Sequence, residues 1–130
     1  MNVPAELLYL SSHEWCRVEG DTCTVGITDY AQHELGDIVY VELPQVGALV
    51  DGPGAVFGAI DSVKAAEELR APVRGEIVEV HEELQTMIEQ INLDPYGQGW
   101  MIRIKVAEPA DLEGLLDADS YRALCESESH

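Results

Sequence analysis

Lys64 is one of only two lysines in this chain of 130 residues, the other being Lys105. One strand is predicted to end near Ile60 and another to restart near Ala66, which places Lys64 at the tip of the connecting turn. A primary amine at such a tip can enter a modifying enzyme, be acylated, and carry the attached group between enzymes, because strands on both sides fix its root. Residues 62–69 also fit one helical turn, and Lys64 is then a surface lysine beside an acidic helix.

Short strands separated by turn residues must position this lysine. Their alternating or β-branched patterns predict strands over residues 15–18, 22–27, 38–43, 55–60, 77–80 and 100–106. The first two flank a hairpin turn at residues 19–21, and Pro44 stops the third. In the last strand, Trp100, Ile102, Ile104 and Val106 are predicted to share one face. A short helix over residues 31–35 is predicted, with Thr28 or Asp29 as its cap and Gly36 at its end.

The pattern Gly-[Asp/Glu]-Ile-Val-x-Val occurs twice, at residues 36–41 and 75–80. Many short strands with such an echo suggest a small sandwich or barrel built from two similar halves. We expect one domain over residues 1–130, with a core at about 7–106 and a C-terminal helical segment at about 109–126. Four leucines at helical spacing (112, 115, 116 and 124) support that segment, Asp117 or Asp119 is expected to cap a second helical piece within it, and residues 126–130 are expected to fray.

The formal net charge of −18, from 25 acidic and 7 basic residues, argues against nucleic acid and anionic membranes as partners. It suits a soluble protein that docks on partners with basic patches. No apolar run approaches the length of a membrane span, and residues 1–15 lack a basic segment followed by a long apolar one. We therefore expect a cytoplasmic protein.

Three cysteines (Cys16, Cys23 and Cys125) make an odd count, which argues against a disulfide framework. The sequence contains no CxxC pair, so we expect no structural zinc site. It also lacks a P-loop, an HExxH or GxSxG motif, and any Cys/His set with a mechanism behind it. We therefore expect a protein without catalytic residues of its own.

Several motifs together resemble one family over almost the full chain. The matching stretches are residues 12–15 (Ser-His-Glu-Trp), 25–29 (Val-Gly-Ile-Thr-Asp), 35–39 (Leu-Gly-Asp-Ile-Val), 41–44 (Val-Glu-Leu-Pro), 62–65 (Ser-Val-Lys-Ala), 71–76 (Ala-Pro-Val-Arg-Gly-Glu), 91–92 (Ile-Asn), 94–97 (Asp-Pro-Tyr-Gly) and 99–100 (Gly-Trp). In number, order and spacing they resemble the H protein of the glycine cleavage system.

This resemblance implies a mostly β barrel-sandwich hybrid with short helices and a C-terminal helix, and lipoate amide-linked to Lys64. The chain would shuttle an aminomethyl group from a pyridoxal-phosphate glycine decarboxylase to an aminomethyltransferase, and dihydrolipoyl dehydrogenase would reoxidise the dithiol. A lipoate-attaching enzyme would be a further partner. Such a carrier works best as a monomer and is not itself an enzyme.

The resemblance also assigns site residues. Asp61, three before the lysine, and Gly75, eleven after it, match the attachment pattern, although the family usually has Glu at the first position. Ser12, Glu14, Asp29 and Glu68 match the polar lining of a cleft that shelters the loaded arm. The family usually has Ser-Asp at the positions of Glu67 and Glu68, and His33 and His81 also depart from its pattern.

Two other readings stay open. One is an H-like protein that relays lipoyl groups to, or carries intermediates for, another lipoate-dependent pathway, an alternative that the departures at Asp61 and Glu67 keep open. The other is an unmodified interaction module on the same scaffold.

Overall fold

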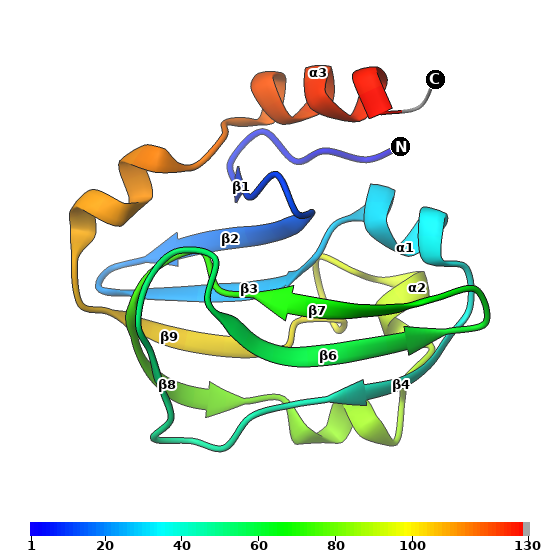
Figure 1. Cartoon of the computed structure of the whole chain (residues 1–130), viewed down its shortest axis with the longest axis horizontal. Coiled ribbons are helices and arrows are strands. Elements are labelled where there is room, and N and C mark those ends of the chain that lie inside the picture. Colours follow the sequence, from blue (N-terminus) through cyan, green and yellow to red (C-terminus); the bar gives the residue numbers. More distant parts are fainter. Residues whose placement is uncertain (129–130) are drawn as a thin grey trace.

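The computed structural model describes residues 1–128, whose strands form two antiparallel sheets (Figure 1). The elements in chain order are β1 (Leu8–Tyr9), β2 (Glu14–Glu19), β3 (Thr22–Ile27), α1 (Asp29–Leu35), β4 (Ile38–Glu42), β5 (Leu49–Val50), β6 (Val56–Ser62), β7 (Ala66–Arg70), β8 (Gly75–Val80), the 3-10 helix η1 (Glu82–Gln85), α2 (Gln90–Leu93), β9 (Ile102–Val106), the 3-10 helix η2 (Pro109–Gly114) and α3 (Ala118–Glu128). Among these residues no helix is long and apolar enough to cross a bilayer.

The six-stranded sheet has the order β1-β2-β3-β9-β8-β5, and the three-stranded sheet has the order β4-β6-β7. The main hydrophobic core contains side chains from both, among them Val25, Val41, Ile60, Ile77 and Ile104. The two echoed segments form β4 and β8, one in each sheet. The fold is thus mostly β with short helices and a C-terminal helix, as predicted.

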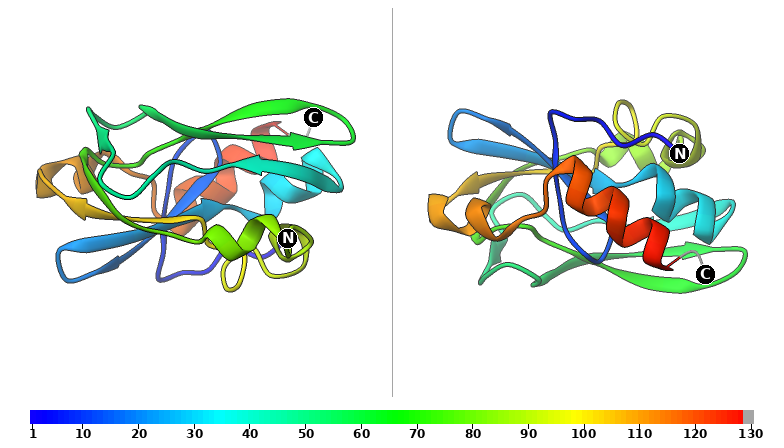
Figure 2. Two further views of the ribbon diagram at one scale, coloured as in Figure 1. Left: turned by 90° about the horizontal axis from the view of Figure 1, so that it is seen from below. Right: turned by 90° about the horizontal axis from the view of Figure 1, so that it is seen from above.

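A second, smaller core lies between α3 and the N-terminal part of the chain. It contains Tyr9, Trp15 and Tyr121, and the rings of Tyr9 and Tyr121 stack with centroids 4.5 Å apart. Tyr9 and Leu116 also exchange two backbone hydrogen bonds of 2.8 Å. Figure 2 shows α3 and the N-terminal segment on the same side of the molecule. The C-terminal helix is therefore packed against the β domain through aromatic contacts.

Local signals position α1. The Thr28 hydroxyl accepts a hydrogen bond from the N–H of Ala31 at 3.1 Å, which identifies Thr28 rather than Asp29 as the cap. Gly36 ends the helix at φ +74° and donates its N–H to the Gln32 carbonyl.

Three expectations need correction. The last strand begins at Ile102: Met101 is buried, whereas Trp100 is only partly buried and stacks on His81, with the Arg103 guanidinium 4.2 Å from its ring. The strand alternation therefore does not extend back to Trp100.

The second correction concerns short elements. The two-residue strands β1 and β5 and the helices η1 and α2 were not predicted, because each is too short to show a period.

The tail is the third correction. It consists of two helical pieces, η2 and α3, as predicted, but the four leucines do not form one stripe: Leu112 and Leu115 pack on the main core, while Leu116 and Leu124 pack on the smaller one. Asp117 caps α3 by accepting the N–H of Ser120 at 2.8 Å. The helix continues to Glu128, so the fraying predicted for residues 126–128 is wrong; residues 129 and 130 lie outside the described part of the chain.

Candidate functional site

The turn between β6 and β7 exposes Lys64 at its tip. The Ser62 hydroxyl accepts the N–H groups of Lys64 and Ala65, each at 3.1 Å, and the Ser62 N–H donates to the Ala65 carbonyl at 2.8 Å. The N–H of Val63 donates to the carbonyl of Asp37 at 3.0 Å, which ties the turn to the loop between α1 and β4. The segment is thus a fixed hairpin turn, and not a helical one.

The Lys64 side chain lies beside the end of α1. A methyl group on Gly36 would come 3.5 Å from Lys64 Cε and 3.5 Å from a methyl of Val63. The lysine is exposed, and no carboxylate within residues 1–128 forms an ion pair with it. Its amine is therefore open to a modifying enzyme, on a root that two strands hold in place.

The two residues of the predicted attachment pattern lie in different settings. Asp61 is on β6, opposite Ala66 on β7, and is half-buried close to the turn. Gly75 begins β8, which in Figure 1 starts at the end of β7 away from that turn. A Cβ on Gly75 would overlap the backbone oxygen of Lys105. The close approach of β8 to β9 therefore requires glycine there.

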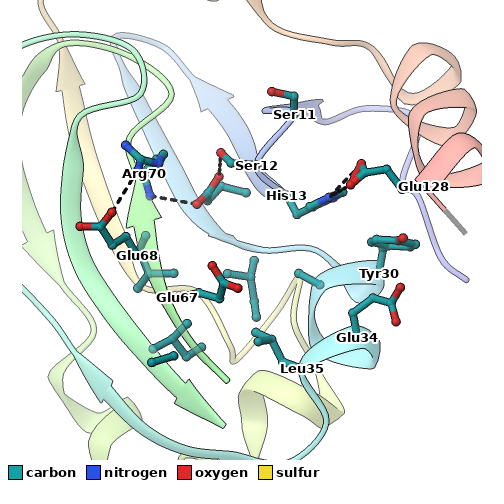
Figure 3. A pocket seen from close by; sticks show the side chains of 16 residues that line it. Ser11, Ser12, His13, Tyr30, Glu34, Leu35, Glu67, Glu68, Arg70 and Glu128 are labelled. Atoms are coloured by element: carbon teal, nitrogen blue, oxygen red, sulfur yellow. Dashed lines mark hydrogen bonds and ion pairs between the residues drawn. The ribbon is translucent and has the colours of Figure 1, made fainter. Parts of the chain in front are cut away.

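A cleft of about 620 Å³ runs beside β7, between that strand, α1 and the loop before β2 (Figure 3). Its lining residues are Ser11, Ser12, His13, Glu14, Ile27, Tyr30, Ala31, Glu34, Leu35, Ile60, Ala66, Glu67, Glu68, Leu69, Arg70 and Glu128. Ser12, Glu14 and Glu68 are thus brought together as the sequence suggested. Asp29 is not: its carboxylate accepts the backbone N–H of Asn2 at 2.8 Å and the amide of Gln32 at 2.7 Å, on a separate surface that also holds His33.

Glu14 is the buried carboxyl of this cleft, with only 2% of its surface exposed. One oxygen accepts the Ser12 hydroxyl at 2.5 Å and the other accepts the backbone N–H of Arg70 at 2.9 Å. Burial raises the pKa of Glu14 to about 7, although these hydrogen bonds and the Arg70 charge oppose the rise. Near neutral pH this carboxyl therefore exchanges readily between its neutral and charged forms.

The cleft is also lined by charged groups that sequence reasoning did not assign to it. Figure 3 shows Glu67 on β7 and Glu34 on α1, and Arg70 pairs with Glu68 at 3.1 Å. Helical spacing could have revealed Glu34, because residues 30, 31, 34 and 35 lie on one face of α1. No local pattern could have placed Glu128, which reaches the cleft from the end of α3.

His13 joins the cleft to the C-terminal helix. It adopts a left-handed backbone conformation at φ +77°. Its Nδ1 lies 2.7 Å from the Tyr121 hydroxyl and its Nε2 lies 3.2 Å from the Glu128 carboxylate. The Tyr121 hydroxyl also lies 2.6 Å from the hydroxyl of Thr28. This network joins the loop before β2 to α3 at the wall of the cleft.

Comparison with known proteins places the whole chain in one group. The sequence profile described as "Glycine cleavage H-protein" matches residues 7–128. The chain is 50% identical over 129 residues to the glycine cleavage system H protein of a Thermus thermophilus strain, covering 99% of this chain and 100% of that protein. It is 49% identical over 126 residues to the protein of that name from Rubrobacter xylanophilus, covering 97% of each.

A solved structure agrees. The crystal structure of a glycine cleavage system H protein from Mycobacterium marinum superposes with a TM-score of 0.85 at 35% sequence identity, covering 93% of this chain and 97% of that one. With the profile match and both relatives spanning nearly the full length, the chain belongs to the glycine cleavage H-protein family.

Proposed function

We propose that this chain carries lipoate, amide-linked to Lys64, and serves glycine cleavage as the shuttling carrier of its aminomethyl group. The observation that carries the proposal is an exposed lysine, without an ion-pair partner in residues 1–128, on a rigid hairpin turn whose second strand forms the wall of a cleft. When bound, lipoate supplies a disulfide that can accept a one-carbon amine and be left as a dithiol. Family membership supports the same role.

The cleft is in reach of the lysine. Eleven single bonds lead from the Lys64 Cα to the ring of a lipoyl group, which extends about 13 Å at about 1.2 Å per bond. Glu68 lies four residues after Lys64, two of them beyond the start of β7 at Ala66, so at 3.3 Å per residue it is at most about 13 Å away. Glu14, which is hydrogen-bonded to Ser12, accepts the backbone N–H of Arg70, two residues further along β7. The polar end of the cleft thus lies within reach of the ring of such an arm.

The chain's own residues would control the charge of the amine on the loaded arm. In this proposal Glu14 and Glu68 favour a protonated amine on the loaded arm, because nearby carboxylates stabilise a cation. A protonated amine has no lone pair with which to expel the thiolate. Ser12 holds Glu14 in place, and Glu67 adds a carboxylate at the rim. Asp61 would be read by the attaching enzyme, whereas we assign Gly75 to the packing of β8 and Asp29 to the surface beside the N-terminus.

The partners follow from the shuttle role. We propose glycine decarboxylase, aminomethyltransferase, dihydrolipoyl dehydrogenase and a lipoate-attaching enzyme, each visited in turn by a monomeric cytoplasmic carrier. The charge of −18 suits brief docking on basic faces. No step requires a nucleophile or general base from the carrier itself.

The test begins with the intact mass of the protein purified from its native host. We expect one lipoyl increment, mapped to the peptide that contains Lys64. Lys64→Arg should abolish the increment, and the matched control Lys105→Arg should keep it. An unmodified chain, or an increment on Lys105, would refute the carrier proposal.

Reconstitution with glycine decarboxylase and labelled glycine then tests whether the carrier serves glycine cleavage or another lipoate-dependent pathway. We expect the lipoylated protein, and not Lys64→Arg, to become labelled. A lipoylated protein that takes no label would instead favour a relay to another lipoate-dependent pathway, the alternative that the departures at Asp61 and Glu67 keep open.

A further inference from the structure

Asn92, in α2, is a polar residue to which the proposed function gives no role. Its side-chain amide makes three hydrogen bonds, all of them to the segment that runs from α1 into β4. The oxygen accepts the backbone N–H of Ile38 at 3.0 Å. The nitrogen donates to the carbonyl of Gly36 at 2.9 Å and to the side chain of Gln32 at 3.0 Å. The amide therefore holds the backbone on both sides of residue 37, as a peptide group of a neighbouring strand would.

The residue between those two backbone contacts, Asp37, holds the turn that carries Lys64. Its carbonyl accepts the N–H of Val63 at 3.0 Å. In the described part of the chain, the other hydrogen bonds of residues 63–65 stay within their own hairpin. Figure 1 shows the chain that leads from α1 to β4 passing the closed end of the hairpin formed by β6 and β7. The orientation of the turn thus depends on where the Asp37 carbonyl points.

A single peptide group connects Asn92 to this turn. The carbonyl of Asp37 and the N–H of Ile38 belong to one planar trans peptide group, so they point in opposite directions. The N–H end is bonded to Asn92 and the carbonyl end to Val63, each at 3.0 Å. Because the group is rigid, a rotation that breaks one bond also misaligns the other. Asn92 is therefore coupled to the lysine turn, although none of its own hydrogen bonds reaches that turn.

Resting on the proposed lipoylation of Lys64, we propose that Asn92 is a positioning residue for this modification. Through the peptide group between Asp37 and Ile38 it holds the turn in the orientation that the attaching enzyme accepts. A mobile turn presents the amine correctly for only part of the time, and the apparent affinity for the enzyme falls by that fraction. Asn92 thus acts on recognition of the lysine and not on the transfer step, in which the lysine amine alone takes part.

The competing interpretation is that Asn92 only stabilises the fold. Loss of its hydrogen bonds lowers the free energy of unfolding under either interpretation, so stability does not separate them. The matched control is Gln32→Ala, which also removes two side-chain hydrogen bonds, one to Asn92 and one to Asp29. It leaves the bonds of Asn92 to Gly36 and Ile38 in place. Only the positioning role predicts that the two variants differ at the turn.

The first measurement is amide hydrogen exchange of the unlipoylated full chain, followed by ¹H–¹⁵N NMR. Val63 is 67% exposed, so protection of its N–H reports the hydrogen bond to Asp37 and not burial. We expect this N–H to exchange about fivefold faster in Asn92→Ala than in the wild-type protein, the effect of one modest hydrogen bond, and at an unchanged rate in Gln32→Ala. A Val63 N–H that is unprotected in the wild-type protein would overturn the proposal without any variant.

The second measurement is the rate of lipoylation of each purified protein by a lipoate-attaching enzyme supplied with lipoate and ATP. For Asn92→Ala we expect KM to rise about fivefold and kcat to stay within about twofold, because the cost lies in ordering the turn on binding. Asn92→Ser should do the same, since its hydroxyl reaches only the position of the amide carbon, and it replaces Asn92→Ala should that variant not fold.

The outcomes separate the two proposals. An unchanged KM in both Asn92 variants, a fall in kcat alone, or an equal rise of KM in Gln32→Ala would refute the positioning role while the proposed function stands. A wild-type protein that accepts no lipoate would instead refute the proposed function, and the positioning role with it.

Discussion

The buried carboxyl of Glu14 should make the stability of this protein fall as the pH rises. Its pKa is about 7 in the folded chain against an ordinary value of 4.5. Below pH 4.5 the group is protonated in both the folded and unfolded states and contributes nothing. Between 4.5 and 7 the folded state holds more protons, so the free energy of unfolding decreases with pH. Above pH 7 the full cost of the buried charge is present.

The size of this effect follows from the two pKa values. At 1.36 kcal/mol per pKa unit, their separation corresponds to about 3 kcal/mol. Glu14→Gln removes the charge and keeps the shape, with a carbonyl for the Arg70 N–H and an amide for Ser12. We therefore expect the variant to exceed the wild-type protein in stability by about 1 kcal/mol at pH 5 and by about 3 kcal/mol at pH 8.

Urea unfolding of the unlipoylated protein between pH 5 and 8, followed by tryptophan fluorescence, measures this difference. Subtracting the two profiles cancels the many carboxylates that both proteins share. Ser12→Ala serves as a second probe: loss of its hydrogen bond to the charged form should raise the pKa of Glu14 further. A difference between wild type and Glu14→Gln that does not change with pH would refute the assignment of a raised pKa to this carboxyl.

Two further predictions concern the scaffold. Gly75→Ala should cost about 2–4 kcal/mol of stability, because the new methyl would overlap a backbone oxygen of the neighbouring strand. The control Gly114→Ala, whose methyl would meet no atom within 4 Å, should change the stability by less than about 0.5 kcal/mol. Denaturant midpoints of the two variants measure the difference. Tyr121→Phe should cost about 1–3 kcal/mol, since its hydroxyl has two buried or part-buried polar partners, whereas Tyr40→Phe on the half-exposed ring of β4 should be nearly neutral; equal losses would contradict this.

The sequence predicted elements well where the signal was local. The cap at Thr28, the glycine at the end of α1 and the hairpin between β2 and β3 all follow from neighbouring residues. The turn at Lys64 was ambiguous because the bond that fixes it, from Val63 to Asp37, joins segments far apart in the chain. Helix propensity within residues 62–69 could not report that contact.

The difference between local signals and contacts of distant segments also explains which predicted residues lie in the cleft. Ser12, Glu14 and Glu68 matched a family motif and do line one cleft, but Asp29 matched equally well and lies elsewhere, held by the N-terminal segment. Glu128 reaches the cleft only because aromatic packing seats α3 against β1. A residue's place in the cleft thus depends on tertiary contacts that a motif does not encode.

Glu14 also links proton balance to the proposed arm. With a pKa of about 7, the carboxyl is about half protonated at pH 7. A cationic amine brought against it lowers that pKa, so docking of a loaded arm should release up to about half a proton per chain at pH 7 and almost none at pH 9. Loading in weakly buffered solution with a pH indicator measures the release, and the difference between wild type and Glu14→Gln isolates this group from the chemistry of loading. If the two proteins release the same number of protons at pH 7, the amine does not dock beside Glu14.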